Sequence, residues 1–311
     1  MRSSALTVLG LLAALATRPP AAEAQGVAVV TQCKGPVTVV EAVSRSPRTL
    51  AVLPDTGRVS GGTLASNDEV VTGSGASAEI RCADGSVFRL EPDSRLAIVE
   101  SALTARRPGD KTVRRTLRLA AGRVACDVKP SESVYTSIRT EAGVVGVRGT
   151  TLTVSYGDAR MQVTVGEGQV FVLDPAARIV FSLGNGQQME LRLEAPATLA
   201  KVTGAGGRAV SVSVGDLRLQ MDDGDAIRVA PGADGALSVT VVSGPVLAGR
   251  GGAAAAEAQT GATLTAGGET PPAAAAEPAA ARAAAAAPPD EVPLLPDVPA
   301  IRDTIEASPM N

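Results

Sequence analysis

The sequence predicts an all-β protein, a sandwich, roll or solenoid of short strands joined by Gly and Asp-Gly turns, with a disordered Ala/Pro/Gly-rich C-terminal tail. Short runs in which apolar and polar residues alternate recur from the N-terminal region to about residue 173. Glycine, Asn, Asp-Gly or Pro separates these runs, and no helical periodicity precedes the tail. The 33 glycines fit this class, because glycine accepts the positive φ of tight turns.

The predicted strands share small inward residues, mostly Val, Ala, Leu and Thr. In chain order they are residues 27–31, 37–42, 69–72, 77–82, 87–90, 95–99, 114–120, 123–128, 134–140, 145–147, 151–156, 161–165 and 169–173.

The clearest pair of strands lies at residues 77–90. Ala78, Ile80 and Cys82 alternate with polar residues, and Asp84-Gly85 precedes the next alternating run. Asp-Gly populates the positive-φ turn that matches strand twist, so this segment predicts a β-hairpin.

The N-terminus predicts export. An uncharged, mostly apolar stretch from Ala5 to Ala16 follows Arg2, and small residues end the segment at Ala24. Cleavage between Ala24 and Gln25 is therefore expected, and the apolar run is shorter than the roughly 20 residues of a membrane span. The mature protein is expected to be periplasmic or secreted, with no membrane span of its own.

The composition changes from about Gly249 onward. Ala, Gly, Pro and Thr dominate residues 251–289, which is typical of a flexible low-complexity tail. The more apolar, proline-spaced residues 292–301 are either part of this tail or a short docking motif in extended conformation.

Composition disfavours several functions. The net charge of −3 argues against a nucleic-acid partner, although Arg114, Arg115, Arg118 and Arg123 form a local basic group. Alternation places Arg114 and Arg118 on one strand face, away from the neighbouring leucines, which indicates a solvated face or an anionic-ligand patch. With only five aromatic residues, three Phe and two Tyr, the chain is poorly suited to stack on carbohydrate.

Catalytic, metal and cofactor sites are not predicted. The chain has no His, so Ser–His and Cys–His relays are excluded. The acidic cluster at Asp222, Asp223 and Asp225 lacks the ligand spacing of a calcium loop, which favours a polar hairpin turn over a cation site.

The three cysteines, Cys33, Cys82 and Cys126, are predicted to lie in an oxidising compartment. Cys82 and Cys126 both continue inward-facing series. Either they form a disulfide with each other, or the cysteines are buried free thiols that pack as small apolar residues.

A weak internal repeat is present. Val163-Thr164-Val165 is followed by Gly168 and Val170, and residues 239–246 have the same types at the same offsets. Residues 62–64 and 261–264 also share a Gly-Thr-Leu-like corner. Chance similarity is the alternative, because Val, Thr and Gly are frequent in this chain.

Four blocks between about residues 34 and 174 resemble the FecR family of extracytoplasmic sensor domains. They are residues 61–100, 117–128, 135–150 and 163–170, and the third contains Val147-Arg148-Gly149-Thr150, which is similar to the family's V-x-G-T signature. Gly149 and Thr150 are interpreted as fold determinants, since Gly permits close backbone approach and the Thr hydroxyl can bond nearby main chain.

The predicted domains are 1–24 (signal peptide), 25–175 (FecR-like β domain), 176–248 (β-rich extension with a possible partial repeat) and 249–311 (low-complexity flexible tail). Together, the resemblance and these features predict an exported binding or sensing module, not an enzyme, that recognises an envelope or membrane protein such as a regulator or receptor. The alternatives are a structural component of the cell surface or envelope and an undetected carbohydrate-active enzyme. Family members that regulate sigma factors carry a cytoplasmic segment and a membrane helix, which this sequence does not show.

Overall fold

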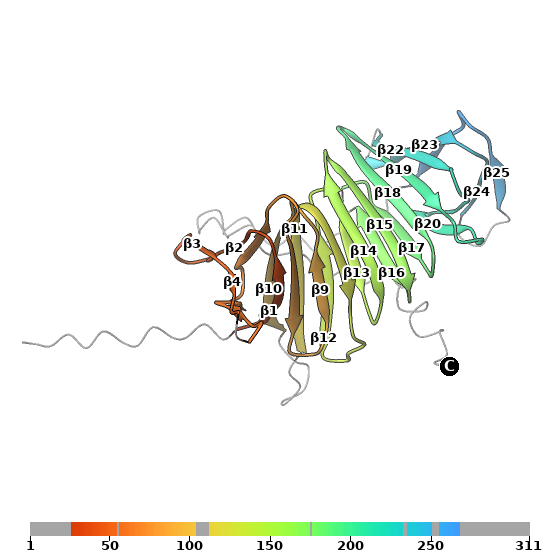
Figure 1. Cartoon of the computed structure of the whole chain (residues 1–311). Helices are drawn as coiled ribbons and strands as arrows, with labels where there is room; N and C mark the ends of the chain where they lie inside the picture. Colours follow the sequence, from red (N-terminus) through yellow and green to blue (C-terminus); the bar gives the residue numbers. More distant parts are fainter. Residues whose placement is uncertain are drawn as a thin grey trace, which may run out of the picture. The chain divides into compact units, whose positions relative to one another are not determined.

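The computed structural model describes residues 26–54, 56–103, 112–174, 176–232, 235–250 and 255–267. The predicted signal peptide, its cleavage site and the segment after residue 267 lie outside the described residues. The regular elements of the described part are β-strands, which confirms the predicted all-β class (Figure 1).

Two long sheets make up the fold. Sheet A has the order β6 (Thr63–Leu64), β1 (Ala28–Lys34), β8 (Ser77–Cys82), β9 (Val87–Leu90), the second half of β11 (Thr112–Asp127), β14 (Thr151–Gly157), β15 (Arg160–Glu167), β18 (Gln188–Glu194), β19 (Ala197–Gly204), β22 (Ala226–Pro231), β23 (Leu237–Ser243) and β26 (Thr263–Ala266).

Sheet B has the order β3 (Pro47–Thr49), β2 (Val37–Val40), β7 (Glu69–Thr72), β10 (Arg95–Leu103), the first half of β11, β12 (Val134–Arg139), β13 (Val144–Val147), β16 (Val170–Asp174), β17 (Ile179–Leu183), β20 (Val210–Val214), β21 (Leu217–Met221), β24 (Val246–Arg250) and β25 (Ala256–Ala258). A separate two-stranded ribbon is formed by β4 (Ala51–Val52) and β5 (Val59–Ser60).

The inward side chains of both sheets form one continuous hydrophobic core. It consists mainly of Val, Leu, Ile and Ala, with Phe88 and Phe181 fully buried. Buried residues alternate strictly with partly or fully exposed ones along β8, β14 and β17, as expected for strands with one face in the core.

Strand β11 joins the two sheets. Its first half pairs with β10 and β12 in sheet B, and its second half pairs with β9 and β14 in sheet A. The sequence predicted two separate strands here, at 114–120 and 123–128, and this prediction is wrong. Gly122 has φ +90°, and a Cβ at this position would lie 2.5 Å from the Ser94 Cα, so a glycine lets the strand bend against Ser94 without ending.

From β14 onward, hairpins alternate between the sheets. β14–β15, β18–β19 and β22–β23 belong to sheet A, whereas β16–β17, β20–β21 and β24–β25 belong to sheet B. Successive sheet A hairpins begin at Thr151, Gln188 and Ala226, and β26 begins at Thr263. A structural unit therefore recurs every 37 or 38 residues.

The repeat noticed in the sequence joins units that are two apart. Val165, Val202 and Val241 occupy equivalent positions, since they pair with Leu152, Met189 and Ile227 directly beside the bulge of each hairpin. The sequence comparison aligned Val165 with Val241 and missed the unit between them, where Ala200 and Lys201 replace the Val-Thr of the pattern.

The described core continues across the predicted boundary at residue 175. β15 pairs with β18 and β16 pairs with β17, so residues on both sides of the boundary share both sheets. β25 and β26 likewise lie after residue 249, where the tail was expected to begin. We propose one structural unit through about residue 267, with the low-complexity segment after it.

Candidate functional site

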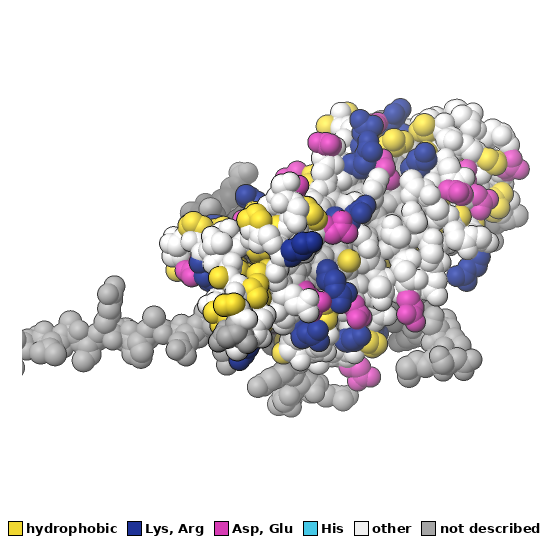
Figure 2. Space-filling view, in the orientation of Figure 1, with side chains coloured by type: hydrophobic (Ala, Val, Ile, Leu, Met, Phe, Trp, Pro, Cys, Tyr) yellow, Lys and Arg dark blue, Asp and Glu magenta, His cyan; other side chains and the backbone are white. Residues whose placement is uncertain are grey.

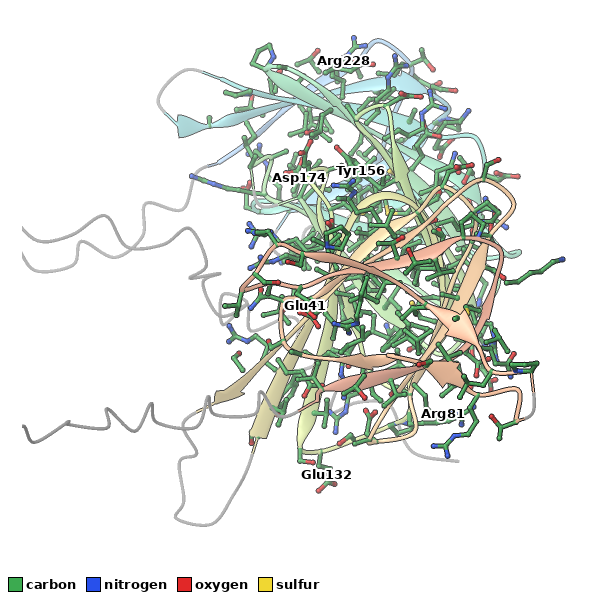
Figure 3. The ribbon with its side chains drawn as sticks, turned by 60° about the vertical axis from the view of Figure 1, so that its left-hand side comes forward. Glu41, Arg81, Glu132, Tyr156, Asp174 and Arg228 are labelled. Atoms are coloured by element: carbon green, nitrogen blue, oxygen red, sulfur yellow. The ribbon has the colours of Figure 1, made fainter. Side chains whose placement is uncertain are left out.

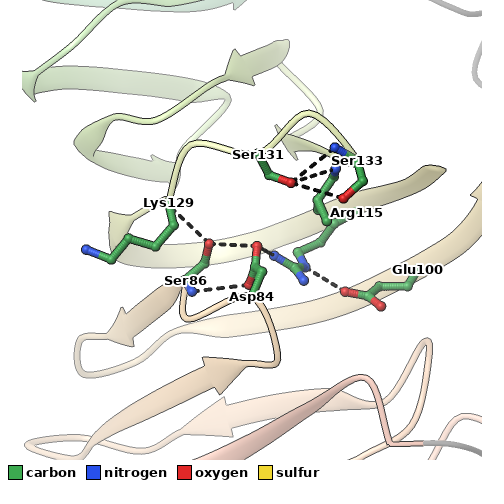
Figure 4. A network of polar contacts seen from close by, with 8 residues as sticks. Asp84, Ser86, Glu100, Arg115, Lys129, Ser131 and Ser133 are labelled. Carbon is green, nitrogen blue, oxygen red and sulfur yellow. Dashed lines mark hydrogen bonds and ion pairs between the residues drawn. The ribbon is translucent and has the colours of Figure 1, made fainter. Parts of the chain in front are cut away.

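A buried ionic cluster connects the two sheets near the β8–β9 turn (Figure 4). Arg115 of β11 is 3% exposed; its Nη1 lies 2.8 Å from Asp84 Oδ2, and its Nε lies 2.6 Å from Glu100 Oε1 of β10. Asp84 belongs to sheet A through its turn, whereas Glu100 and Arg115 belong to sheet B. The cluster therefore fixes the turn of one sheet against two strands of the other.

Asp84 also organises the surrounding loops. Its carboxylate accepts hydrogen bonds from the Ser86 backbone N–H at 3.1 Å and from the Ser86 hydroxyl at 3.0 Å. The Ser86 Oγ in turn accepts a bond from the Lys129 N–H at 3.1 Å, which positions the segment that leads from β11 to β12. The predicted turn residues Asp84 and Gly85 (φ +83°) thus do lie in a tight turn.

The charges in the cluster balance unevenly. Burial by itself would raise the pKa of Asp84, but hydrogen bonds and the charge of Arg115, together with Ser86, lower it overall. Two carboxylates against one guanidinium leave no spare cation for an anionic ligand. We interpret the cluster as a structural element that positions loops.

Sequence reasoning missed Arg115. Arg115, Leu117 and Leu119 lie at every second position of β11, and all three are buried on the same face of the strand. The alternation that assigned Arg114 and Arg118 to the outer face already indicated an inward Arg115. Its two carboxylate partners lie 31 and 15 residues away in sequence, and no local pattern reveals them.

Gly149 and Thr150 lie at a tight corner before β14. Gly149 has φ +64°, and a Cβ there would approach the Pro130 Cγ to 2.8 Å. Thr150 is 2% exposed, and its hydroxyl donates to the Gln169 carbonyl at 3.0 Å. Both residues have internal structural roles, in line with their interpretation as fold determinants.

Of the two alternatives for Cys82 and Cys126, the structure has the free buried thiols and not the disulfide. Cys82 lies on β8 and Cys126 on β11, and β9 runs between these strands. Two strand spacings of about 4.8 Å exceed the Cα separation that a disulfide spans. Cys33, Cys82 and Cys126 are free thiols, and burial raises the pKa of each, to about 12 for Cys82.

The acidic turn at residues 222–225 serves the backbone. Asp225 is 3% exposed, and its Oδ2 accepts a hydrogen bond from the Asp222 N–H at 2.7 Å. Desolvation, followed by the nearby Asp222 charge, raises the pKa of Asp225 despite that hydrogen bond. Among the described residues, no group of three or more acidic or thiol side chains is arranged to hold a metal ion.

The two ends of the sheets differ in how they are covered. At the N-terminal end the edge strands β6 and β3 are two and three residues long, and the β4–β5 ribbon lies beside β1. Val29, Val52 and Leu53 are 41–46% exposed, and apolar side chains are visible over this end in Figure 2. Arg81, which opposes Val29 across the β1–β8 pair, is exposed at the surface (Figure 3).

At the C-terminal end the sheets finish with β25 and β26. Within the described residues, β25 pairs with β24 alone and β26 with β23 alone, so each strand leaves one edge open. A groove of about 430 Å³ lies between them, lined by residues that include Leu217, Ala248, Ala258, Ala262 and Leu264. Together with the two edges that are open in the described residues, this groove forms the candidate binding site.

Comparison with known proteins finds a family match to one segment of the chain. Residues 68–171 match the family model described as FecR protein, which confirms the resemblance seen in the sequence. This match supports a regulatory sensing or binding module, and it leaves the partner open. No curated protein sequence matches the chain.

Two solved structures are similar to the chain. Both are crystal structures of a putative anti-sigma factor from Parabacteroides distasonis, at 1.65 Å and 2.50 Å resolution. Each match has 21% sequence identity and a TM-score of 0.34, and it covers 43% of this chain and 59% of that chain. In the described residues no helix is long and apolar enough to cross a membrane.

Proposed function

We propose that this chain, whose residues 68–171 match FecR, is an exported module that recognises a protein partner in the cell envelope and acts by binding. The observation that carries the proposal is the C-terminal end of the sheets, where two edges that no other described strand pairs with flank an apolar groove. Unpaired edges present N–H and C=O groups that another chain can bind.

Main-chain pairing is the proposed mode of recognition. Proteins usually protect sheet edges by short strands, charged residues or a covering segment. The N-terminal end fits this rule, because its edge strands β6 and β3 are only two and three residues long and the β4–β5 ribbon lies beside β1, the neighbour of β6. At the C-terminal end, the four-residue strand β26 lies next to the apolar side chains of the groove, and no described segment covers its edge apart from the Arg250 side chain. We therefore propose that the edge of β26 binds a partner, which would explain why it is less covered than the edges at the N-terminal end.

The proposal includes export and a relay. The N-terminal segment has the features of a cleavable signal, so the module would act in the periplasm or outside the cell. A regulatory role then requires a membrane protein, such as a regulator or receptor, to carry the signal further.

A binding role also agrees with the chemistry of the side chains. The chain has no His, and its three thiols have raised pKa values, so they are protonated at neutral pH and poor nucleophiles. We propose that the protein is not an enzyme. Hydrolysis of any member of a glycan panel by the purified chain would contradict this.

The test of the proposed function is cross-linking in cells. The tagged full-length chain is cross-linked, captured under denaturing conditions and analysed by mass spectrometry, with an unrelated exported β protein as control. Enrichment of one membrane or envelope protein over the control is expected. Recovery of abundant wall and surface material alone, in equal amounts with the control, would refute a specific partner.

A structural role is the second candidate, and the repeated hairpins favour it. Units of 37 or 38 residues extend the sheets well beyond the family match, as expected of a spacer. A loss of envelope integrity on deletion, without any specific partner, would support this candidate over the first.

A further inference from the structure

The strand β26 is the first strand of an incomplete unit. Gly149, Gly186, Gly224 and Gly261 all have positive φ, and each lies two residues before the first strand of a sheet A hairpin. The hydrogen bonds also recur: Gly186, Gly224 and Gly261 donate to the carbonyls of Val165, Val202 and Val241 at 2.9, 3.0 and 2.8 Å. β26 is therefore the structural equivalent of β14, β18 and β22.

The three complete units show what lies beside the equivalent strand. β14, β18 and β22 each pair antiparallel with a following strand, β15, β19 or β23. Those following strands bury an inward residue at every second position: Met161, Val163 and Val165 in β15, Thr198, Ala200 and Val202 in β19, and Leu237, Val239 and Val241 in β23. A strand of this pattern is what the edge of β26 lacks in the described residues.

The exposure of Leu264 indicates that the described residues lack a strand beside β26. Leu152, Met189, Ile227 and Leu264 each lie three residues after the corner glycine. The first three are at most 2% exposed, whereas Leu264 is only half-buried and lines the groove. The groove thus lies where the inward side chains of the next strand would pack.

The backbone of β26 is oriented for such a strand. Val241 donates to the Ala262 carbonyl at 2.9 Å, and in an antiparallel ladder the bonded pairs recur at every second residue. Leu264 and Ala266 therefore bond towards β23, and the N–H and C=O groups of Thr263 and Thr265 point to the open edge. The Thr265 carbonyl accepts a hydrogen bond from Arg250 Nη2, so the Arg250 side chain covers part of that edge.

We infer that the open edge of β26 accepts an extended segment of a partner protein, which pairs antiparallel with β26 and buries Val or Leu side chains at alternate positions in the groove. The segment takes the place that β15, β19 and β23 have in the complete units, and it displaces Arg250 from the Thr265 carbonyl. This inference rests on the proposed function and specifies the partner's chemistry.

Peptide binding to the purified full-length chain tests the inference. The probe is a labelled seven-residue peptide with the sequence of β23, residues 237–243, and fluorescence anisotropy reports binding. A matched peptide with Val239→Asp and Val241→Asp tests the apolar side chains, and an N-methylated copy of the probe tests main-chain pairing. We expect saturable binding of the probe and at least about tenfold weaker binding of both controls.

Variants of the chain locate the site. Thr265→Pro removes an N–H that faces the open edge, so it should weaken probe binding about fivefold, the effect of one net hydrogen bond. Arg250→Ala should strengthen binding, because it frees the Thr265 carbonyl. Arg228→Ala removes the same charge from an exposed side chain of sheet A that bonds Glu194, and it should leave binding unchanged. Unfolding curves show whether each variant is folded. The N-methylated peptide is tested on the unchanged chain, so its result does not depend on the folding of any variant.

The outcomes separate this inference from the proposed function. Equal binding of the probe and its N-methylated copy would overturn strand pairing. Occupation of the edge by a second copy of the chain, seen as a concentration-dependent dimer that Thr265→Pro dissolves, would also overturn the inference. Occupation of the edge by the chain's own residues after Gly267 would overturn it as well. Cellular capture of one partner by both native chain and Thr265→Pro would keep the proposed function and refute this site. Peptide binding by the purified chain without any captured partner in cells would keep this site and refute the proposed function.

Discussion

The part of the chain before β14 and the part from β14 onward build the same two sheets by different means. Before β14, the strand order within each sheet departs from chain order, β11 serves both sheets, and β11 and β12 pair in parallel. From β14 onward, antiparallel hairpins alternate regularly, and each packs on the one before. Contacts in the second part are therefore closer in sequence.

This difference determines how each part is stabilised. The first part depends on single contacts between distant segments, such as the Arg115 cluster and the close approach of Gly122 to Ser94. The second part repeats one modest set of contacts in every unit, as repeat proteins do. Substitutions should therefore lower the free energy of unfolding strongly at a few positions of the first part, and by similar amounts at equivalent positions of the second part.

The largest effect is expected for Arg115→Met. The substitution leaves the Asp84 and Glu100 carboxylates without their buried cation, which should lower the free energy of unfolding by about 3–5 kcal/mol. Urea unfolding measures the loss. Arg123→Met is the control, because its ion pair with Glu91 is half exposed and 3.5 Å long, and it should cost less than about 1 kcal/mol. Equal losses in the two variants would disprove the special role of the cluster.

A pair of glycine substitutions compares the two parts directly. Gly122→Ala and Gly224→Ala both place a side chain at positive φ, which costs about 1–2 kcal/mol. Only Gly122 lacks space, because its Cβ would meet Ser94, whereas nothing lies within 4 Å of a Cβ on Gly224. We expect a total loss of roughly 3 kcal/mol for Gly122→Ala and about 1 kcal/mol for Gly224→Ala in thermal unfolding. A larger loss at Gly224 would reverse the comparison.

Equivalent core positions test the regularity of the second part. Val165→Ala, Val202→Ala and Val241→Ala each remove two buried methyl groups and should each cost about 2 kcal/mol. Denaturant unfolding of the three variants checks this. Losses that differ by more than about 1 kcal/mol would show that the units are not energetically equivalent.

The smallest effect concerns acid titration. The folded-state pKa of Asp84 is lowered, so its contribution to stability is present above the unfolded pKa of about 3.9 and is lost as the pH falls through the folded pKa. The folded-state pKa of Asp225 is raised, so its contribution is present at low pH and is lost as the pH rises through that value.

Asp225→Asn should therefore stabilise the protein slightly at pH 7, by less than about 1 kcal/mol, and this gain should disappear near pH 3. Unfolding curves at both pH values, with Asp223→Asn as the control, measure the difference. A gain that is independent of pH would show that the Asp225 charge is not its cause.

Much of the first part could be predicted from sequence, because its signals are local. The strands at Glu69–Thr72, Ser77–Cys82 and Val87–Leu90 have the predicted limits, since alternation and an Asp-Gly turn define them. The path of β11 through both sheets depends on what packs against Gly122, which no local pattern shows. The ion partners of Arg115 are equally remote.

The second part was less well predicted, although it is more regular. Its corners share a positive-φ glycine, but the next residue changes from Thr150 to Gln187, Asp225 and Ala262. The first three are buried and serve their own corners by different hydrogen bonds. Similar geometry is thus produced by dissimilar side chains, which hides the unit from sequence comparison. The open edge of β26 could not be foreseen, because it is defined by the strand that the pattern lacks.

The path of β11 has a mechanical consequence. Its 16 residues pair with four strands, two in each sheet. A tensile load along this strand would be borne in shear by ladders of both sheets, so neither sheet could slide or peel away without breaking the other. In the proposed binding role, such a strand would resist a pull exerted by a bound partner.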